Sequence, residues 1–131
     1  PAPPDRERIL PAFAAFEDRA APREAERAWR RAADDWPDEP IVWLGLGNAA
    51  HRQGRWQAAR EAYRRVLELD PDRLPARLNL AQSYAADGMA CEGLEALGPA
   101  PAEDHGLHAA YREAERRLRA ACGGDPPRSR R

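Results

Sequence analysis

The sequence contains no lysine and no threonine, and all 21 of its basic residues are arginine. Schiff-base chemistry and phosphate-binding P-loops both use a lysine, so we expect neither. The β-branched residues that favour β-sheet are limited to Ile9, Ile41, Val42 and Val66. No apolar run approaches the roughly 18 residues of a membrane-spanning helix. These absences predict an all-α chain that does not insert into a membrane.

Charge and cysteine content exclude further classes of function. The formal net charge is −1, although 33% of the residues are charged. A domain that binds nucleic acid by neutralising phosphates is normally basic, so we expect no nucleic-acid partner. Neither of the two cysteines has a histidine in phase with it, which argues against a catalytic cysteine. The sequence predicts a non-enzymatic domain without a cofactor.

The first residue is Pro1 rather than methionine. This start indicates a processed product or a piece of a larger protein. An upstream domain in the parent protein is therefore one expectation.

Residues 40–73 carry the clearest pattern in the chain. Two segments with apolar residues at every third or fourth position are joined by Gln53-Gly54-Arg55 and end at Asp70-Pro71, as in a helical hairpin. Glycine tolerates the positive φ of a reversal, and proline cannot continue a helix. The stretch resembles a tetratricopeptide repeat (TPR) with Ala50 in the slot that usually holds Tyr. The residues at the offsets of that motif are Trp43, Leu46, Gly47, Ala59, Tyr63 and Pro71.

The resemblance implies a solenoid in which helical hairpins stack into a right-handed superhelix. Shifting the motif by its 34-residue period gives weaker copies on both sides, with Trp29 matching Tyr63 and Gly88 matching Gly54. We expect a TPR domain at 1–122, with repeats at about 6–39, 40–73 and 74–103, a capping helix at 104–121, and a disordered tail at 123–131.

Repeats of this family bind a protein or peptide along a concave face that the first helix of each repeat lines. Here that face would present Leu44 and Leu78 beside polar side chains. We predict a peptide-binding site at Asn48, His51, Arg52, Asn79 and Gln82.

Asn48 and Asn79 match the asparagines that hold a peptide backbone in dicarboxylate-clamp members of the family. The slots for the basic clamp residues hold Leu44, Ala109 and Glu113 instead. Backbone recognition through side-chain amides remains open, because an amide both donates and accepts. The alternative is that the two asparagines are ordinary solvated residues.

Cys91 and Cys122 are expected on the same edge of the array. By repeat phase, Cys91 begins the second helix of the third repeat and Cys122 ends the capping helix, which brings their Cα atoms within disulfide range. A bond that closes a loop of about 30 residues stabilises a fold by roughly 3–4 kcal/mol. It would indicate an oxidising, periplasmic or otherwise exported location. The alternative is two unrelated thiols in a cytoplasmic protein.

His105 and His108 lie three residues apart beside Glu103 and Asp104. Such a group can hold a metal. A surface pair at a helix N-terminus, with Asp104 as the cap, is the commoner arrangement. We expect no metal here.

The leading hypothesis is a protein-interaction scaffold. The Trp43-to-Asn48 stretch, the short third repeat with its cysteine and the lysine-free composition also resemble the C-terminal repeat tail of bacterial exported cysteine peptidases of the papain-like superfamily. That resemblance implies no catalytic residue in this chain. The other hypotheses are a regulatory or substrate-docking domain of a larger enzyme, and a structural part of an envelope or secretion assembly.

Overall fold

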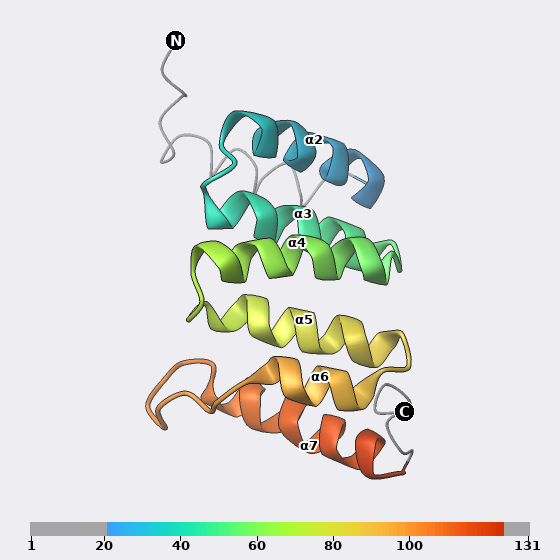
Figure 1. Ribbon diagram of the computed structural model, residues 1–131, viewed down its shortest axis with the longest axis vertical. Coiled ribbons are helices and arrows are strands. Elements are labelled where there is room, and N and C mark those ends of the chain that lie inside the picture. The colour runs from blue at the N-terminus through green and yellow to red at the C-terminus, as the bar shows by residue number, and fades with distance from the viewer. Residues whose placement is uncertain (1–20, 125–131) are drawn as a thin grey trace.

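The computed structural model describes residues 21–124, which contain no β-strand, so the predicted all-α class is confirmed. Figure 1 shows the helices of this range stacked along the longest axis of the molecule. The predicted first helix of the first repeat falls on residues outside this range. The helices are α2 (Pro22–Asp35), α3 (Pro40–Arg52), α4 (Trp56–Leu69), α5 (Leu74–Ala86), α6 (Ala90–Leu97) and α7 (His108–Gly124).

Prolines and glycines set the ends of these helices. A proline occupies the first or second position of α2, α3 and α5, where its missing N–H interrupts no helical hydrogen bond. Gly54, between α3 and α4, has a φ of 72°, and Gly88, between α5 and α6, has a φ of 77°. Only glycine adopts such angles without strain. The predicted reversals of the chain therefore occur at the expected residues.

The helices pack as a regular array of antiparallel pairs. Helix α3 packs on α4, and α5 packs on α6. The second helix of each pair also contacts the next helix along the chain, in the order α2–α3, α4–α5 and α6–α7. Contacts of α3 with α5, and of α5 with α7, join the first helices of successive pairs. Within residues 21–124, no helix is both long and apolar enough to cross a membrane.

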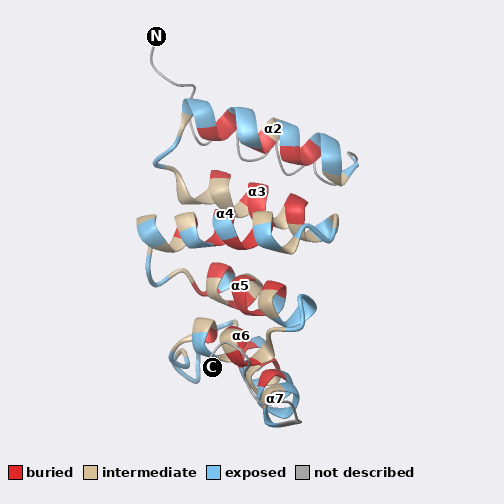
Figure 2. Cartoon of the chain, turned by 45° about the vertical axis from the view of Figure 1, so that its right-hand side comes forward, coloured by how far each residue is buried: buried red, intermediate tan, exposed pale blue. Residues whose placement is uncertain are grey.

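Two glycines in α3 let the neighbouring helices come close. A Cβ atom on Gly47 would lie 2.5 Å from the Tyr63 ring of α4, and one on Gly45 would lie 2.2 Å from the Trp29 ring of α2. Both aromatic side chains are buried, so they lie directly on the backbone of α3. In Figure 2, the buried residues of α2 face the helices below it and the exposed residues face outward.

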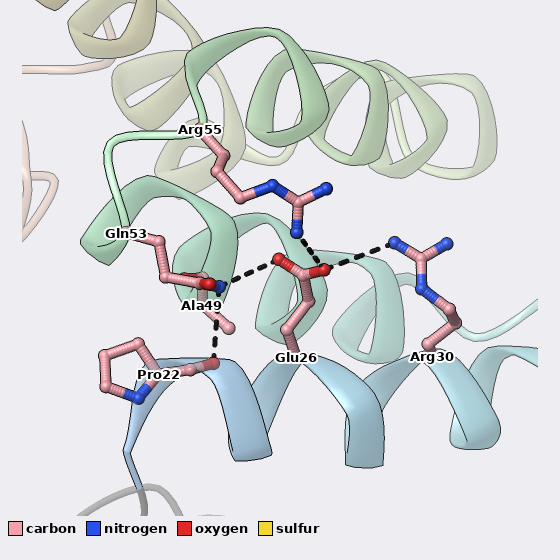
Figure 3. A network of polar contacts seen from close by, with 6 residues as sticks. All are labelled: Pro22, Glu26, Arg30, Ala49, Gln53 and Arg55. Atoms are coloured by element: carbon pink, nitrogen blue, oxygen red, sulfur yellow. Dashed lines mark hydrogen bonds and ion pairs between the residues drawn. The ribbon is translucent and has the colours of Figure 1, made fainter.

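A polar network joins α2 to the turn between α3 and α4 (Figure 3). The Glu26 carboxylate of α2 accepts hydrogen bonds from Arg55, from Gln53 at 2.9 Å and from Arg30 at 3.5 Å. The Gln53 amide also donates to the carbonyl of Ala49 at 3.0 Å. Burial by itself would raise the pKa of Glu26, but Arg55, with help from Gln53 and Arg30, lowers it below its ordinary value. The carboxylate is therefore held in its charged form.

The loop that connects α6 to α7 is held by two side chains from other parts of the array. Arg77 of α5 donates to the carbonyls of Leu97 at 3.0 Å and Pro99 at 2.9 Å. The Tyr111 hydroxyl of α7 donates to the carbonyl of Gly98 at 2.6 Å. These bonds satisfy carbonyl groups that the C-terminus of α6 leaves without helical partners.

The bounds of the capping helix differ from those predicted. Helix α7 begins at His108 rather than Asp104, so the assignment of Asp104 as its cap is wrong. Residues 103–107 form turns instead, in which the Leu107 N–H donates to Nδ1 of His105 at 3.0 Å. The helix continues to Gly124, past the expected start of the tail. Residues 125–131 of that tail lie outside the described range.

Candidate functional site

A hollow of about 310 Å³ lies where α3, α4 and α5 meet. We call it the groove. Four of the five predicted site residues line it, together with Tyr63, which sequence analysis identified only as a residue of the repeat motif. Gln82 is exposed on α5 and does not line it. The lining residues are Asn48, His51, Arg52, Tyr63 and Asn79.

The two asparagines form a hydrogen-bonded pair across α3 and α5. Asn79 donates from Nδ2 to Oδ1 of Asn48 at 2.9 Å, and the Tyr63 hydroxyl donates to the same oxygen at 2.8 Å. That oxygen is therefore doubly occupied. Within residues 21–124, Nδ2 of Asn48 and Oδ1 of Asn79 keep their donor and acceptor capacity.

Tyr63 orients this pair. Its side chain is 1% exposed, and burial raises the pKa of its hydroxyl well above the ordinary value. The hydroxyl therefore stays protonated and available as a hydrogen-bond donor around neutral pH. Sequence analysis gave Tyr63 no role in the groove. The available signal was its phenolic oxygen, because a buried tyrosine hydroxyl usually has a partner.

His51 and Arg52 occupy the end of the groove at the last turn of α3. Nδ1 of His51 is 3.0 Å from the hydroxyl of Ser83, which is fully buried on α5. The His51 ring also meets the Trp56 ring in an edge contact, with 5.0 Å between centroids. Burial lowers the pKa of His51 below its ordinary value. Sequence analysis missed Ser83, since nothing local relates it to a histidine 32 residues earlier.

The two leucines of the predicted face have different roles. Leu44 is half-buried and packs against the cluster that contains Ala50 and Tyr63. Leu78 is 7% exposed and belongs to the core between α5, α6 and α7. Leu78 is therefore part of the core and is not a surface for a ligand.

Cys91 of α6 and Cys122 of α7 are joined by a disulfide, with their Cα atoms 4.7 Å apart. Cys91 is 8% exposed and Cys122 is half-buried. The bond lies at the opposite end of α7 from Tyr111, which holds the loop before that helix. Helix α7 is thus attached to α6 near both of its ends.

The remaining candidates for chemistry do not form a site. Residues 21–124 contain no group of three or more metal-ligating side chains. Nδ1 of His108 lies 3.3 Å from the Pro101 carbonyl, and Nδ1 of His105 accepts from the backbone. A second, larger hollow of about 510 Å³ includes Arg55 and Asp87 in its lining. Those two charged groups are already paired, with Glu26 and Arg60 respectively.

Comparison of the sequence with known families agrees with the array of helices. Two family profiles described as tetratricopeptide repeat match the chain, one over residues 14–73 and one over residues 50–122. The second match alone spans more than half of the 131 residues. The chain belongs to the tetratricopeptide repeat family. TPR arrays generally serve as scaffolds for protein interactions, and they are typically non-catalytic. No curated protein matches this TPR sequence.

Proposed function

We propose that the groove binds an extended segment of a partner protein through the side-chain amides of Asn48 and Asn79. The supporting observation is the shared oxygen of Asn48, which accepts from both Tyr63 and Asn79. This arrangement leaves Nδ2 of Asn48 able to donate and Oδ1 of Asn79 able to accept. A peptide unit offers the complementary carbonyl and N–H groups.

The orientation of the Asn48 amide is fixed by the buried Tyr63 hydroxyl, and this favours binding. Because Tyr63 is buried and stays protonated, the Asn48 side chain cannot rotate without leaving the tyrosine hydroxyl unpaired. An unpaired buried hydroxyl costs about 1–3 kcal/mol. The amides are therefore preorganised, and little side-chain entropy is lost when a peptide binds.

The sharpest test replaces Asn48 by aspartate. Asn48→Asp keeps an oxygen for Tyr63 and Asn79 but exchanges the free donor for an acceptor, which repels a peptide carbonyl. The probe is a phage-displayed library of random seven-residue peptides, selected on the wild-type domain and then synthesised. We expect Asn48→Asp to weaken the binding of a selected peptide by roughly tenfold in calorimetry. That change corresponds to the loss of about one hydrogen bond. Asn79→Ala should weaken it similarly.

Gln82→Ala provides the matched control, because Gln82 is a polar residue on α5 that does not line the groove. Its binding should equal that of the wild type. Circular dichroism melting of each variant checks that the fold is retained. Failure to select any peptide, or equal binding by Asn48→Asp, would reject backbone recognition by this pair.

A further inference from the structure

The end of the groove at His51 and Arg52 is cationic. Arg52 is exposed and has no ion-pair partner among residues 21–124. The lining of the groove includes no aspartate or glutamate. A ligand that enters this end therefore meets an arginine whose charge no described carboxylate neutralises.

His51 has one ring nitrogen left for a ligand. Nδ1 is occupied by the hydroxyl of Ser83, at 3.0 Å. The remaining polar atom of the ring is Nε2, and the ring itself lines the groove. In the free protein, burial opposes protonation of the ring, since it lowers the pKa of His51. An anion beside Nε2 would favour the protonated ring and raise the pKa of His51.

No carboxylate of the described helices packed around α3 lines the groove. Asp87, after α5, pairs with Arg60 of α4 at 3.0 Å. Glu26 of α2 is bound by Arg55. Glu61 of α4 is exposed and lines the second hollow, not the groove. Tyr63 of α4 lines the groove and stays neutral. Within the groove, a negative charge that stabilises a protonated His51 is one that the ligand brings.

We propose that His51 and Arg52 form a subsite for a carboxylate side chain of the bound peptide, and that His51 takes up a proton from solvent as this carboxylate binds. The carboxylate stays ionised, and the neutral ring gains one proton at the nitrogen that lacks it. The resulting imidazolium donates from Nε2 to the carboxylate and from Nδ1 to the Ser83 hydroxyl, so one positive charge is gained beside one negative charge. This inference rests on the proposed function, because the amide pair places the peptide whose side chain reaches the subsite. The subsite differs from the dicarboxylate clamp. The positions that correspond to the basic residues of that clamp are occupied here by Leu44, Ala109 and Glu113.

The sign of the pH dependence follows from linkage. Without ligand, His51 is neutral around neutral pH, and its pKa lies below the ordinary value of 6.5. A bound carboxylate raises that pKa, so the complex holds more protons than the free protein between the two values. Affinity should increase as the pH falls from about 7.5 to about 5.5. It should decrease again near pH 4, where aspartate and glutamate side chains become protonated.

The experiment uses the library peptides selected on the wild-type domain at about pH 6. We expect enrichment of aspartate or glutamate at one position. A synthesised acidic peptide should bind roughly three- to tenfold more tightly at pH 5.5 than at pH 7.5, and calorimetry in buffers of different ionisation enthalpy should show proton uptake. The same peptide with asparagine or glutamine at that position should show neither effect.

Two variants separate the roles of the subsite residues. His51→Gln should abolish proton uptake and the pH dependence. Arg52→Gln should weaken binding about fivefold at both pH values, as expected for an exposed charge pair, while proton uptake persists. Arg27→Gln is the matched control, because Arg27 is exposed on α2 and does not line the groove, and it should bind as the wild type does.

The outcomes distinguish this inference from the function on which it rests. Peptides that depend on Asn48 but show no acidic preference, or proton uptake that survives His51→Gln, would overturn the subsite and leave backbone recognition standing. If no peptide is selected, or if Asn48→Asp binds normally, the proposed function itself fails and the subsite fails with it.

Discussion

The two ends of the described array are joined to their neighbours by different kinds of contact. At the N-terminal end, α2 is attached by the buried Trp29 ring, which lies on Gly45, and by the charged network around Glu26. At the C-terminal end, α7 is attached to α6 by the Cys91–Cys122 disulfide and by apolar residues. The α2 junction is entirely non-covalent and includes charged side chains, whereas the α7 junction includes a covalent bond.

The two junctions also differ in the length of the helices that form them. Helix α2 extends over Pro22–Asp35 and buries Trp29 and several alanines. Helix α6 extends only over Ala90–Leu97, so its seam with α7 is shorter. A short seam contributes less hydrophobic stabilisation, in proportion to the area removed from water. The disulfide offsets this deficit by limiting the freedom of the unfolded chain.

The outward side of α7 carries paired charges. Glu113 receives hydrogen bonds from Arg116 and Arg117, and Glu115 receives them from Arg112. These contacts lower the pKa of both glutamates. Such pairs keep this side of α7 polar and hydrated, unlike the side that packs on α6.

Removal of the Trp29 side chain should have the largest effect. Trp29→Ala deletes a buried ring and leaves a void against Gly45, which should lower the free energy of unfolding by about 4 kcal/mol. Urea unfolding measures the change. Trp43→Ala is the control, because Trp43 is only half-buried and bonds a loop carbonyl at 2.8 Å. Equal losses in the two variants would contradict the view that α2 depends on Trp29.

Reduction of the disulfide should have the next largest effect. Opening Cys91–Cys122 should lower the free energy of unfolding by about 3 kcal/mol, because the closed loop spans 31 residues of separation. Hydrogen exchange should accelerate in α7 and stay unchanged in α2. The Cys91→Ser, Cys122→Ser double variant should match the reduced wild type. Two free thiols in denatured, unreduced protein would show that the bond does not form.

Replacement of Glu26 by glutamine should have the smallest effect. Glu26→Gln removes a charge-assisted network and should lower the free energy of unfolding by about 2 kcal/mol at neutral pH. Because the folded pKa of Glu26 lies below 4.5, its contribution is present above pH 4.5 and is lost as the pH falls through the folded value. The difference between wild type and Glu26→Gln should therefore shrink in acid. A difference that is constant from pH 7 to pH 3 would contradict this assignment.

Sequence reasoning succeeded where the signal was local. The apolar period of residues 40–73 and the glycine at position 54 predicted the α3–α4 hairpin. Asn48 and Asn79 were selected from the family resemblance and not from a local pattern, and both line the groove. It was wrong about the start of α7, because the turns after Pro101 use the backbone and side chain of His105 rather than the Asp104 cap. Helix ends depend on such individual hydrogen bonds, and composition does not reveal them.

The sequence by itself determined that this chain forms antiparallel helix pairs, because periodicity and turn residues act within a few positions of each other. Only the tertiary structure decided which polar atoms of the groove are occupied. Tyr63 and Asn79 bind one oxygen of Asn48, and Ser83 binds His51. These partners come from three separate helices, so their pairing depends on how the helices stack and not on the pattern of any one segment.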